Sequence, residues 1–521
     1  MLFNSLTYAL FLPIVFFLYW FVFGYALDKC KHQVLIQNAF LVLASYVFYA
    51  YWDWRFLGLL VGMSLLSYGV GQVLTNATGG GIRGTSRKIL LWAAIVIDLG
   101  ILGFFKYYNF FVNSFCDLFG LDASHSTLQL ILPLGISFFT FQAISYVVDA
   151  YKRPLHGYTN SPFSLDTVSP VKRGTPCPQG QGESKPLLES LINCLLYIGF
   201  FPKLLAGPIE RPSNFIPQCR QKRVFDYALA TDGCRQILWG LFKKVVVADN
   251  CATYVNAVYA DIAHQSGSTL LLAAILYTIQ IYGDFSGYSD MAIGSAKLLG
   301  FRFKDNFLFP YFSRNMNEFW RRWHISLNTW FVDYVYIPLG GSRNGKARTI
   351  ANTMIIFLLS GLWHGADWSF VAWGGYHGLL LVILILLGLN TKYENVVAHD
   401  RWYPNVKEIG QMLLTFALAT IGWILFRADN FAQAWEVMSG ICDRSLLSVP
   451  WLRNRHWYCM IIISVLIMFI VEWLARYSGR ILSFGRCRIL ILLNYLICFI
   501  IAELIYFLGH FDYSSFIYFQ F

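Results

Sequence analysis

Two histidines in aromatic, apolar surroundings are the residues of this sequence best suited to chemistry. The first, His364, ends an apolar run between Gly361 and Gly365, which permit close approach of a ligand or of another backbone. Ionisable side chains inside a membrane are costly, so each is a candidate for function. A histidine that is neutral at physiological pH can take a proton from an attacking hydroxyl group. His364 is therefore a candidate general base.

The second histidine, His324, lies in the densest polar and aromatic stretch of the chain, residues 317–330 with the sequence NEFWRRWHISLNTW. On one continuous helix, the spacing places four residues on a common apolar face: Trp320, Trp323, His324 and Leu327. A second face carries Arg314, Glu318 and Arg321. The pattern predicts an interfacial or partly inserted amphipathic helix. The residues alone leave open the alternative that His324 is a core histidine hydrogen-bonded to the backbone.

A metal site is not predicted from these histidines. No nearby residues complete a facial triad or a tetrahedral ligand set with His324 and His364 at a suitable spacing. The 11 cysteines are scattered singly and form no Cys-x-x-Cys pair. We therefore predict neither a bound metal nor a disulfide framework.

Carboxylates also fall within an apolar segment, residues 282–294. One hypothesis makes Asp284, Ser286 and Asp290 part of the polar wall of a substrate tunnel. The interpretation favoured by the residues themselves is a buried network that orients the backbone or pairs with an arginine.

Composition identifies the environment in which these residues work. Of 521 residues, 57% are hydrophobic, 18% are aromatic and only 13% are charged, against roughly 25% charged residues in soluble domains. A soluble fold has too little surface to hide so much apolar material, so the chain is a polytopic membrane protein. The net charge of +11 comes from short basic runs beside apolar segments, as in cytoplasmic loops. A nucleic-acid-binding function is excluded because no basic soluble domain is present.

Apolar segments with the ~20 residues needed to cross a bilayer predict an all-α fold with about 11–14 transmembrane or re-entrant helices. The predicted spans are 6–26, 33–52, 56–75, 89–111, 128–150, 187–206, 235–257, 351–364, 367–389, 409–427, 457–475 and 487–509. Residues 268–300 supply one or two more, interrupted by glycines and by the two aspartates. We expect a single membrane domain over 1–521, in which the Pro- and Gly-rich residues 154–186 form a disordered, cytoplasmic loop.

Five motifs in order along the chain resemble the membrane-bound O-acyltransferase family, and within it the bacterial branch of alginate O-acetyltransferase membrane subunits. They are LPLGISFFTFQ at 132–142, AGPIER at 206–211, YGDFSGYSD at 282–290, FWRRWHISL at 319–327 and LWHG at 362–365. The C-terminal residues FIYFQF at 516–521 also resemble this branch. Each motif alone is weak, but five in the family's order are specific. Residues 154–186 depart from the family, whose connection there is shorter.

The resemblance implies an acyltransferase whose helices surround a tunnel through the bilayer. His364 matches the catalytic histidine of the family, and His324 matches the second active-site position. Trp320, Trp323 and Trp363 are then expected to wall the pocket around them. The donor implied is acetyl-CoA or another acyl thioester, without a tightly bound cofactor. Its phosphates are expected to meet a group of cations on the cytoplasmic side: Arg314, Arg321, Arg322, Arg343 and Lys346.

The family also implies where the acyl group goes. The expected acceptor is a hydroxyl of a polysaccharide outside the cytoplasmic (inner) membrane of a bacterium, reached directly or through a serine-hydrolase-like acetyltransferase partner. One alternative keeps the fold and changes the cargo to D-alanine for teichoic acid. A second alternative is a transporter or flippase in which the histidines line a proton or substrate path.

Overall fold

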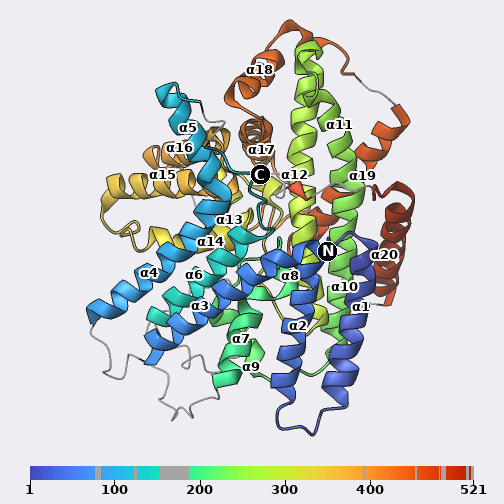
Figure 1. Cartoon of the computed structure of the whole chain (residues 1–521). Helices are drawn as coiled ribbons and strands as arrows, with labels where there is room; N and C mark the ends of the chain where they lie inside the picture. Colours follow the sequence, from blue (N-terminus) through green and yellow to red (C-terminus); the bar gives the residue numbers. More distant parts are fainter. Residues whose placement is uncertain are drawn as a thin grey trace.

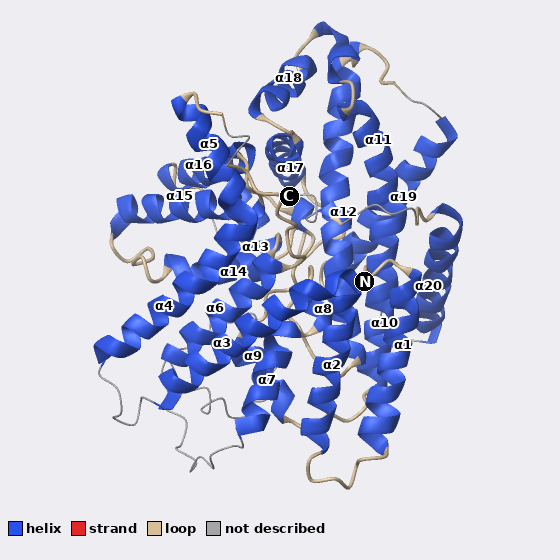
Figure 2. Ribbon diagram, in the orientation of Figure 1, coloured by secondary structure: helices blue, strands red, loops and turns tan. Residues whose placement is uncertain are grey.

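The described part of the computed structural model contains helices and no strands (Figure 2). It comprises residues 1–76, 84–122, 126–152, 187–390, 393, 395–451, 455–479, 481–482, 488–511 and 516–517. The predicted insert at 154–186 lies outside these residues. The all-α, polytopic fold class is confirmed.

Twenty α-helices follow one another along the described chain (Figure 1). They are α1 Leu6–Phe17, α2 Gln33–Asp53, α3 Leu57–Asn76, α4 Gly84–Leu102, α5 Tyr108–Phe119, α6 Ile136–Lys152, α7 Leu187–Gly199, α8 Phe201–Leu204, α9 Pro212–Arg220, α10 Tyr227–Leu241, α11 Asp249–Tyr259, α12 Gly267–Leu298, α13 Met316–Arg322, α14 Ile325–Phe331, α15 Gly345–His364, α16 Trp368–Leu386, α17 Val406–Arg427, α18 Phe431–Ile441, α19 Arg455–Ala475 and α20 Arg488–Leu508. Short π-helical turns at Leu18–Tyr25, Gly103–Tyr107, Phe242–Ala248 and Val332–Tyr336 continue or join some of them.

Seven stretches within the described residues are long and apolar enough to cross a membrane. They are Leu6–Tyr25, Gln33–Asn76, Gly84–Phe119, Gly267–Leu298, Trp368–Leu386, Val406–Arg427 and Trp457–Ala475. Two shorter apolar helices, Leu187–Gly199 and Leu492–Leu508, add to them. The protein is therefore a multi-pass membrane protein.

The centre of the fold is α12, the long helix in Figure 1 against which α10, α11 and α17 pack. The prediction that glycines and aspartates interrupt residues 268–300 is wrong, because α12 continues unbroken for 32 residues. The glycines serve helix packing instead. A Cβ on Gly287 would lie 2.6 Å from the carbonyl oxygen of Gly240 on α10, and one on Gly240 would lie 2.5 Å from that of Gly287. Small residues thus bring two backbones together, as is common between membrane helices.

A second close pair of helices carries the candidate base. Helices α15 and α16 form a hairpin, and a Cβ on Gly361 would lie 2.2 Å from the carbonyl oxygen of Phe370. A Cβ on Gly374 would lie equally close to the carbonyl oxygen of Phe357. The space beside Gly361 is therefore taken by the backbone of α16. This packing places the last turn of α15 deep in the protein.

The α10–α12 contact makes a stability prediction. We expect Gly240→Ala to destabilise the protein by about 1–3 kcal/mol, because the added methyl meets backbone atoms that have no room to move. Thermal unfolding in detergent measures the effect. The matched control is Gly62→Ala in α3, where a Cβ meets nothing within 4 Å. Equal unfolding temperatures for the two variants would contradict this account of α12.

Candidate active site

His364 is the last residue of α15, and the backbone changes direction immediately after it. Gly365 is extended, with φ −155° and ψ 154°, so the helix ends there. The imidazole is 4% exposed and packs edge-on against aromatic rings, with centroid distances of 4.9 Å to Trp363, 5.0 Å to Trp373 and 5.5 Å to Phe426. Packing therefore fixes the ring in one orientation.

His324 lies at a break between two short helices, where the sequence predicted one continuous helix. That prediction is wrong: α13 ends at Arg322, Trp323 is extended, and α14 starts at Ile325. His324 itself has φ 43° and ψ 53°, in the left-handed region that few residues other than glycine occupy. The break turns the imidazole into the core, where it is 1% exposed.

Asn306 holds this unusual turn in place. Its backbone carbonyl accepts the N–H of Ile325 at 2.9 Å, and its Oδ1 accepts the hydroxyl of Ser326 at 2.8 Å. Its Nδ2 donates to the hydroxyl of Ser289 on α12 at 3.0 Å. The buried Asn306 thus fastens the start of α14, and with it His324, to the central helix.

The two histidines, 40 residues apart in the sequence, lie beside each other. Their ring centroids are 6.4 Å apart, and Trp363 contacts both, at 4.9 Å from His364 and 5.9 Å from His324. Phe285 of α12 packs on the other side of His324 at 4.6 Å. Neither ring nitrogen of His324 has a hydrogen-bond partner among the described residues. Burial among apolar rings favours the neutral imidazole, which can accept a proton.

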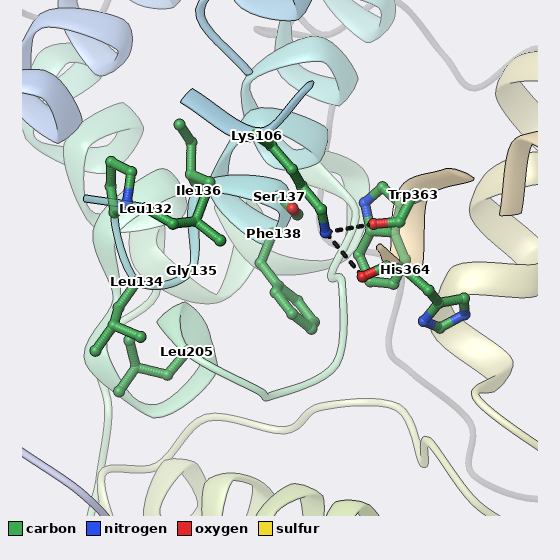
Figure 3. Close-up of a pocket in the computed structure, with 11 residues that line it drawn as sticks. Lys106, Leu132, Leu134, Gly135, Ile136, Ser137, Phe138, Leu205, Trp363 and His364 are labelled. Carbon is green, nitrogen blue, oxygen red and sulfur yellow. Dashed lines mark hydrogen bonds between the residues drawn. The ribbon is translucent and has the colours of Figure 1, made fainter. Parts of the chain in front are cut away.

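A small cavity of about 60 Å³ opens beside His364 (Figure 3). It is lined by Lys106, Leu132, Pro133, Leu134, Gly135, Ile136, Ser137, Phe138, Leu205, Trp363 and His364. Most of these residues belong to the segment that precedes and begins α6. The cavity has room for a few non-hydrogen atoms, which is the size of an acetyl group or of several water molecules.

The three predicted tryptophans differ in their distance from the histidine pair. Trp363 contacts both rings, as described above. Trp320 packs on His377 at 4.9 Å, and Trp323 packs on Trp423 at 4.8 Å. Trp320 and Trp323 thus belong to an aromatic cluster behind the two histidines.

The acidic tunnel candidates form ion pairs with lysines. The carboxylate of Asp284 lies 2.6 Å from the ammonium of Lys244, and that of Asp290 lies 2.6 Å from the ammonium of Lys243. Asp284 also accepts the backbone N–H of Ile517, near the C-terminal end, at 2.7 Å. Ser286, between the two aspartates, is buried.

The five predicted phosphate-binding cations are divided between two environments. Arg314 and Arg322 both pair with the buried carboxylate of Glu318, at 3.0 Å and 2.8 Å. The remaining three are exposed: Arg321, Arg343 and Lys346. These three exposed cations can bind a soluble anion without first breaking an internal ion pair.

Two residues at the site, Lys106 and Asn306, escaped the sequence analysis. Lys106 donates to the carbonyl oxygens of Trp363 at 2.7 Å and His364 at 2.9 Å (Figure 3). A lysine within a predicted apolar span was the signal for it, because an ionisable residue at that depth is a candidate for function. Asn306, by contrast, is a polar residue in a loop with no motif of its own.

In the described part of the chain, no three His, Cys, Asp or Glu side chains gather closely enough to hold a metal ion. The site instead brings together two buried imidazoles, one of which belongs to a residue that lines the acetyl-sized cavity. This arrangement suits proton transfer from a hydroxyl group during its attack on an acyl carbon.

Comparisons with known proteins agree with this chemistry. The sequence model of the membrane-bound O-acyltransferase family matches residues 117–392. The chain is 37% identical to a probable alginate O-acetylase AlgI of Pseudomonas aeruginosa over 404 residues, 77% of this chain and 69% of the relative. It is 34% identical to a peptidoglycan O-acetyltransferase of Helicobacter pylori, over 85% of this chain and 80% of that one. A teichoic acid D-alanyltransferase of Bacillus subtilis is 26% identical over 59% of this chain and 71% of its own length.

The left-handed backbone at His324 makes a stability prediction. We expect His324→Gly to be more stable than His324→Ala by about 1 kcal/mol, because glycine adopts a positive φ without the steric cost that a Cβ brings. Both variants lose the imidazole, so their thermal unfolding in detergent compares the backbone effect alone. An alanine variant as stable as the glycine variant would rule out the left-handed turn.

Proposed function

This chain belongs to the membrane-bound O-acyltransferase family and is an acyltransferase, and we propose that it transfers acetyl groups from a cytoplasmic thioester to hydroxyl groups of an extracytoplasmic polysaccharide. The observation that carries the proposal is the buried pair of His364 and His324, together with an acetyl-sized cavity that His364 helps to line. The relatives named for O-acetylation of alginate and peptidoglycan support the acyl group and the class of acceptor.

His364 acts as the general base. Its imidazole takes the proton of the acceptor hydroxyl while the hydroxyl oxygen bonds to the thioester carbon. The carbon–sulfur bond of the resulting tetrahedral intermediate then breaks, and the imidazolium returns the proton to the departing thiolate. Apolar burial disfavours the imidazolium, so the proton is passed on rather than kept.

His324 orients the reactants and stabilises the oxyanion. Its ring lies beside His364, and its nitrogens have no other partner among the described residues, so an N–H is available to the developing negative charge. Trp363 contacts both rings and helps to keep them in place.

Acetyl-CoA is the proposed donor. Its phosphates require cations at the cytoplasmic surface, and the exposed members of the predicted group are available: Arg321, Arg343 and Lys346. Arg314 and Arg322 form ion pairs with the buried Glu318 on the same segment of chain as Arg321. The proposed wall of the path for the reactants includes Trp320, Trp323, Asp284, Ser286 and Asp290.

The proposed location is the inner membrane of a bacterium, with a serine-hydrolase-like acetyltransferase outside it as partner. A second candidate function is D-alanyl transfer toward teichoic acid, which a relative named as a teichoic acid D-alanyltransferase favours. That relative is less similar and covers less of the chain than the O-acetylating relatives. Acetyl transfer is therefore the better supported reaction.

The first test removes the base. We expect His364→Ala to lower the rate of acetyl transfer from radiolabelled acetyl-CoA in membranes by about 10²–10⁴-fold, the usual contribution of a general base. Expression and detergent extraction of the variant should match wild type. Transfer at a near wild-type rate would refute the role of His364, and labelling by a D-alanyl thioester instead of acetyl-CoA would favour the second candidate function.

The second test concerns donor binding. We expect Arg321→Gln to raise KM for acetyl-CoA about 2- to 5-fold with little change in kcat, since an exposed charge pair contributes up to ~1 kcal/mol to binding of both ground and transition states. The control is Arg444→Gln, which changes an exposed arginine in the turn that packs against the N-terminal end of α12 and is not among the predicted phosphate-binding cations. An unchanged KM for the Arg321 variant, or an equal rise in the control, would remove Arg321 from the donor site.

A further inference from the structure

The last three carbonyl groups of α15 are all bound by side chains of one dipeptide. Tyr107 donates its hydroxyl to the carbonyl oxygen of Leu362 at 2.8 Å. Its neighbour Lys106 donates to those of Trp363 and His364 at 2.7 Å and 2.9 Å. Figure 3 shows the ammonium of Lys106 between these two oxygens, at the edge of the cavity.

These contacts meet a physical requirement of the helix end. The last four carbonyl groups of an α-helix have no partner within the helix, and a buried carbonyl without a partner costs about 1–3 kcal/mol. The chain turns away at the extended Gly365, so α15 cannot continue and satisfy them. A cation at this end also interacts favourably with the helix dipole.

An irregular turn delivers the two side chains. Residues Gly103–Tyr107 form the π-helical turn between α4 and α5, within the apolar stretch Gly84–Phe119. Lys106 is paired with no carboxylate among the described residues, although an ammonium at this depth is costly. A neutral donor would satisfy a carbonyl at a lower cost. Satisfying the carbonyl groups alone therefore does not account for a lysine at this position, and the neighbouring site is the other feature that it contacts.

We propose that Lys106 and Tyr107 are positioning residues for His364. They fix the last turn of α15, and thereby hold the imidazole at its distance from His324. This inference rests on the proposed function, in which His364 acts as the base. Small displacements of a reacting group are sufficient to matter, because a misplacement of about 1 Å costs up to ~10²-fold in rate.

The test compares purified variants per mole of folded protein, measured by size-exclusion chromatography and thermal unfolding in detergent. We expect Lys106→Met to lower kcat about 10- to 100-fold while KM for acetyl-CoA stays within about twofold of wild type. Lys106→Arg retains a cation with several donors, so we expect its kcat to be about tenfold higher than that of Lys106→Met. Tyr107→Phe removes one hydroxyl from the same helix end and should lower kcat about 3- to 10-fold, also without a change in KM.

The matched control is Arg87→Met. Arg87 also donates to two carbonyl oxygens at helix ends, those of Leu74 in α3 and Tyr151 in α6. Its loss removes the same kind of contact from helices that do not carry the histidines. We expect the folded control to keep kcat within about twofold of wild type.

Two results would overturn the inference: a folded Lys106→Met variant with wild-type kcat, or an arginine variant no better than the methionine variant. If Lys106→Met does not fold, Tyr107→Phe decides, and wild-type kcat in that variant overturns the inference. His364→Ala in the same assay separates the two proposals. Acetyl transfer that survives loss of His364 refutes the proposed function, whereas transfer that needs His364 but not Lys106 or Tyr107 refutes only the positioning role.

Discussion

The constraint on which the site depends is that polar backbone groups in a water-poor protein interior must find partners within the protein. Both candidate histidines lie where regular helix stops: His364 at a helix end and His324 in a left-handed turn between two helices. Each irregularity exposes backbone groups that a continuous helix would satisfy. Lys106 and Tyr107 satisfy them at one place, and Asn306 at the other.

The helices around the site make these contacts possible because they approach closely. Glycines on α12 and α10 bring the two backbones together, and Gly361 does the same for α15 and α16. Helix α12 contacts the turn at His324 through Phe285 and Ser289, while α15 packs along α16 up to its last turn. Close packing within these two helix pairs thus helps to set the distance between two side chains that belong to different parts of the chain.

The fold class was predictable from the sequence because apolar runs of sufficient length predict membrane helices. The residues alone left open whether His324 is a core histidine, and it was the resemblance to a family that grouped it with His364. The structure places the two rings 6.4 Å apart. The break at Trp323–His324 was not predictable in this way. The helical spacing of Trp320, Trp323 and Leu327 continues across it, and the interaction that stabilises the break comes from Asn306, which no local pattern connects to it. The continuity of α12 was missed for the converse reason. Glycines lower the intrinsic stability of a helix, but here they allow the backbone of a neighbouring helix to pack closely. That gain depends on tertiary structure.

The lysine partners of Asp284 and Asp290 illustrate the same limit. A buried carboxylate predicts that a cation lies near it in the fold. The sequence alone does not say which of the many lysines and arginines that cation is. Only the packing of the π-helical turn Phe242–Ala248 against α12 selects Lys243 and Lys244. Their charges are compensated within the membrane domain by these aspartates, whereas Lys106 is held by carbonyl oxygens alone among the described residues. Lys106 lines the cavity and also binds the carbonyl groups at the end of α15. The end of the helix that carries His364 and the wall of the cavity therefore share one side chain.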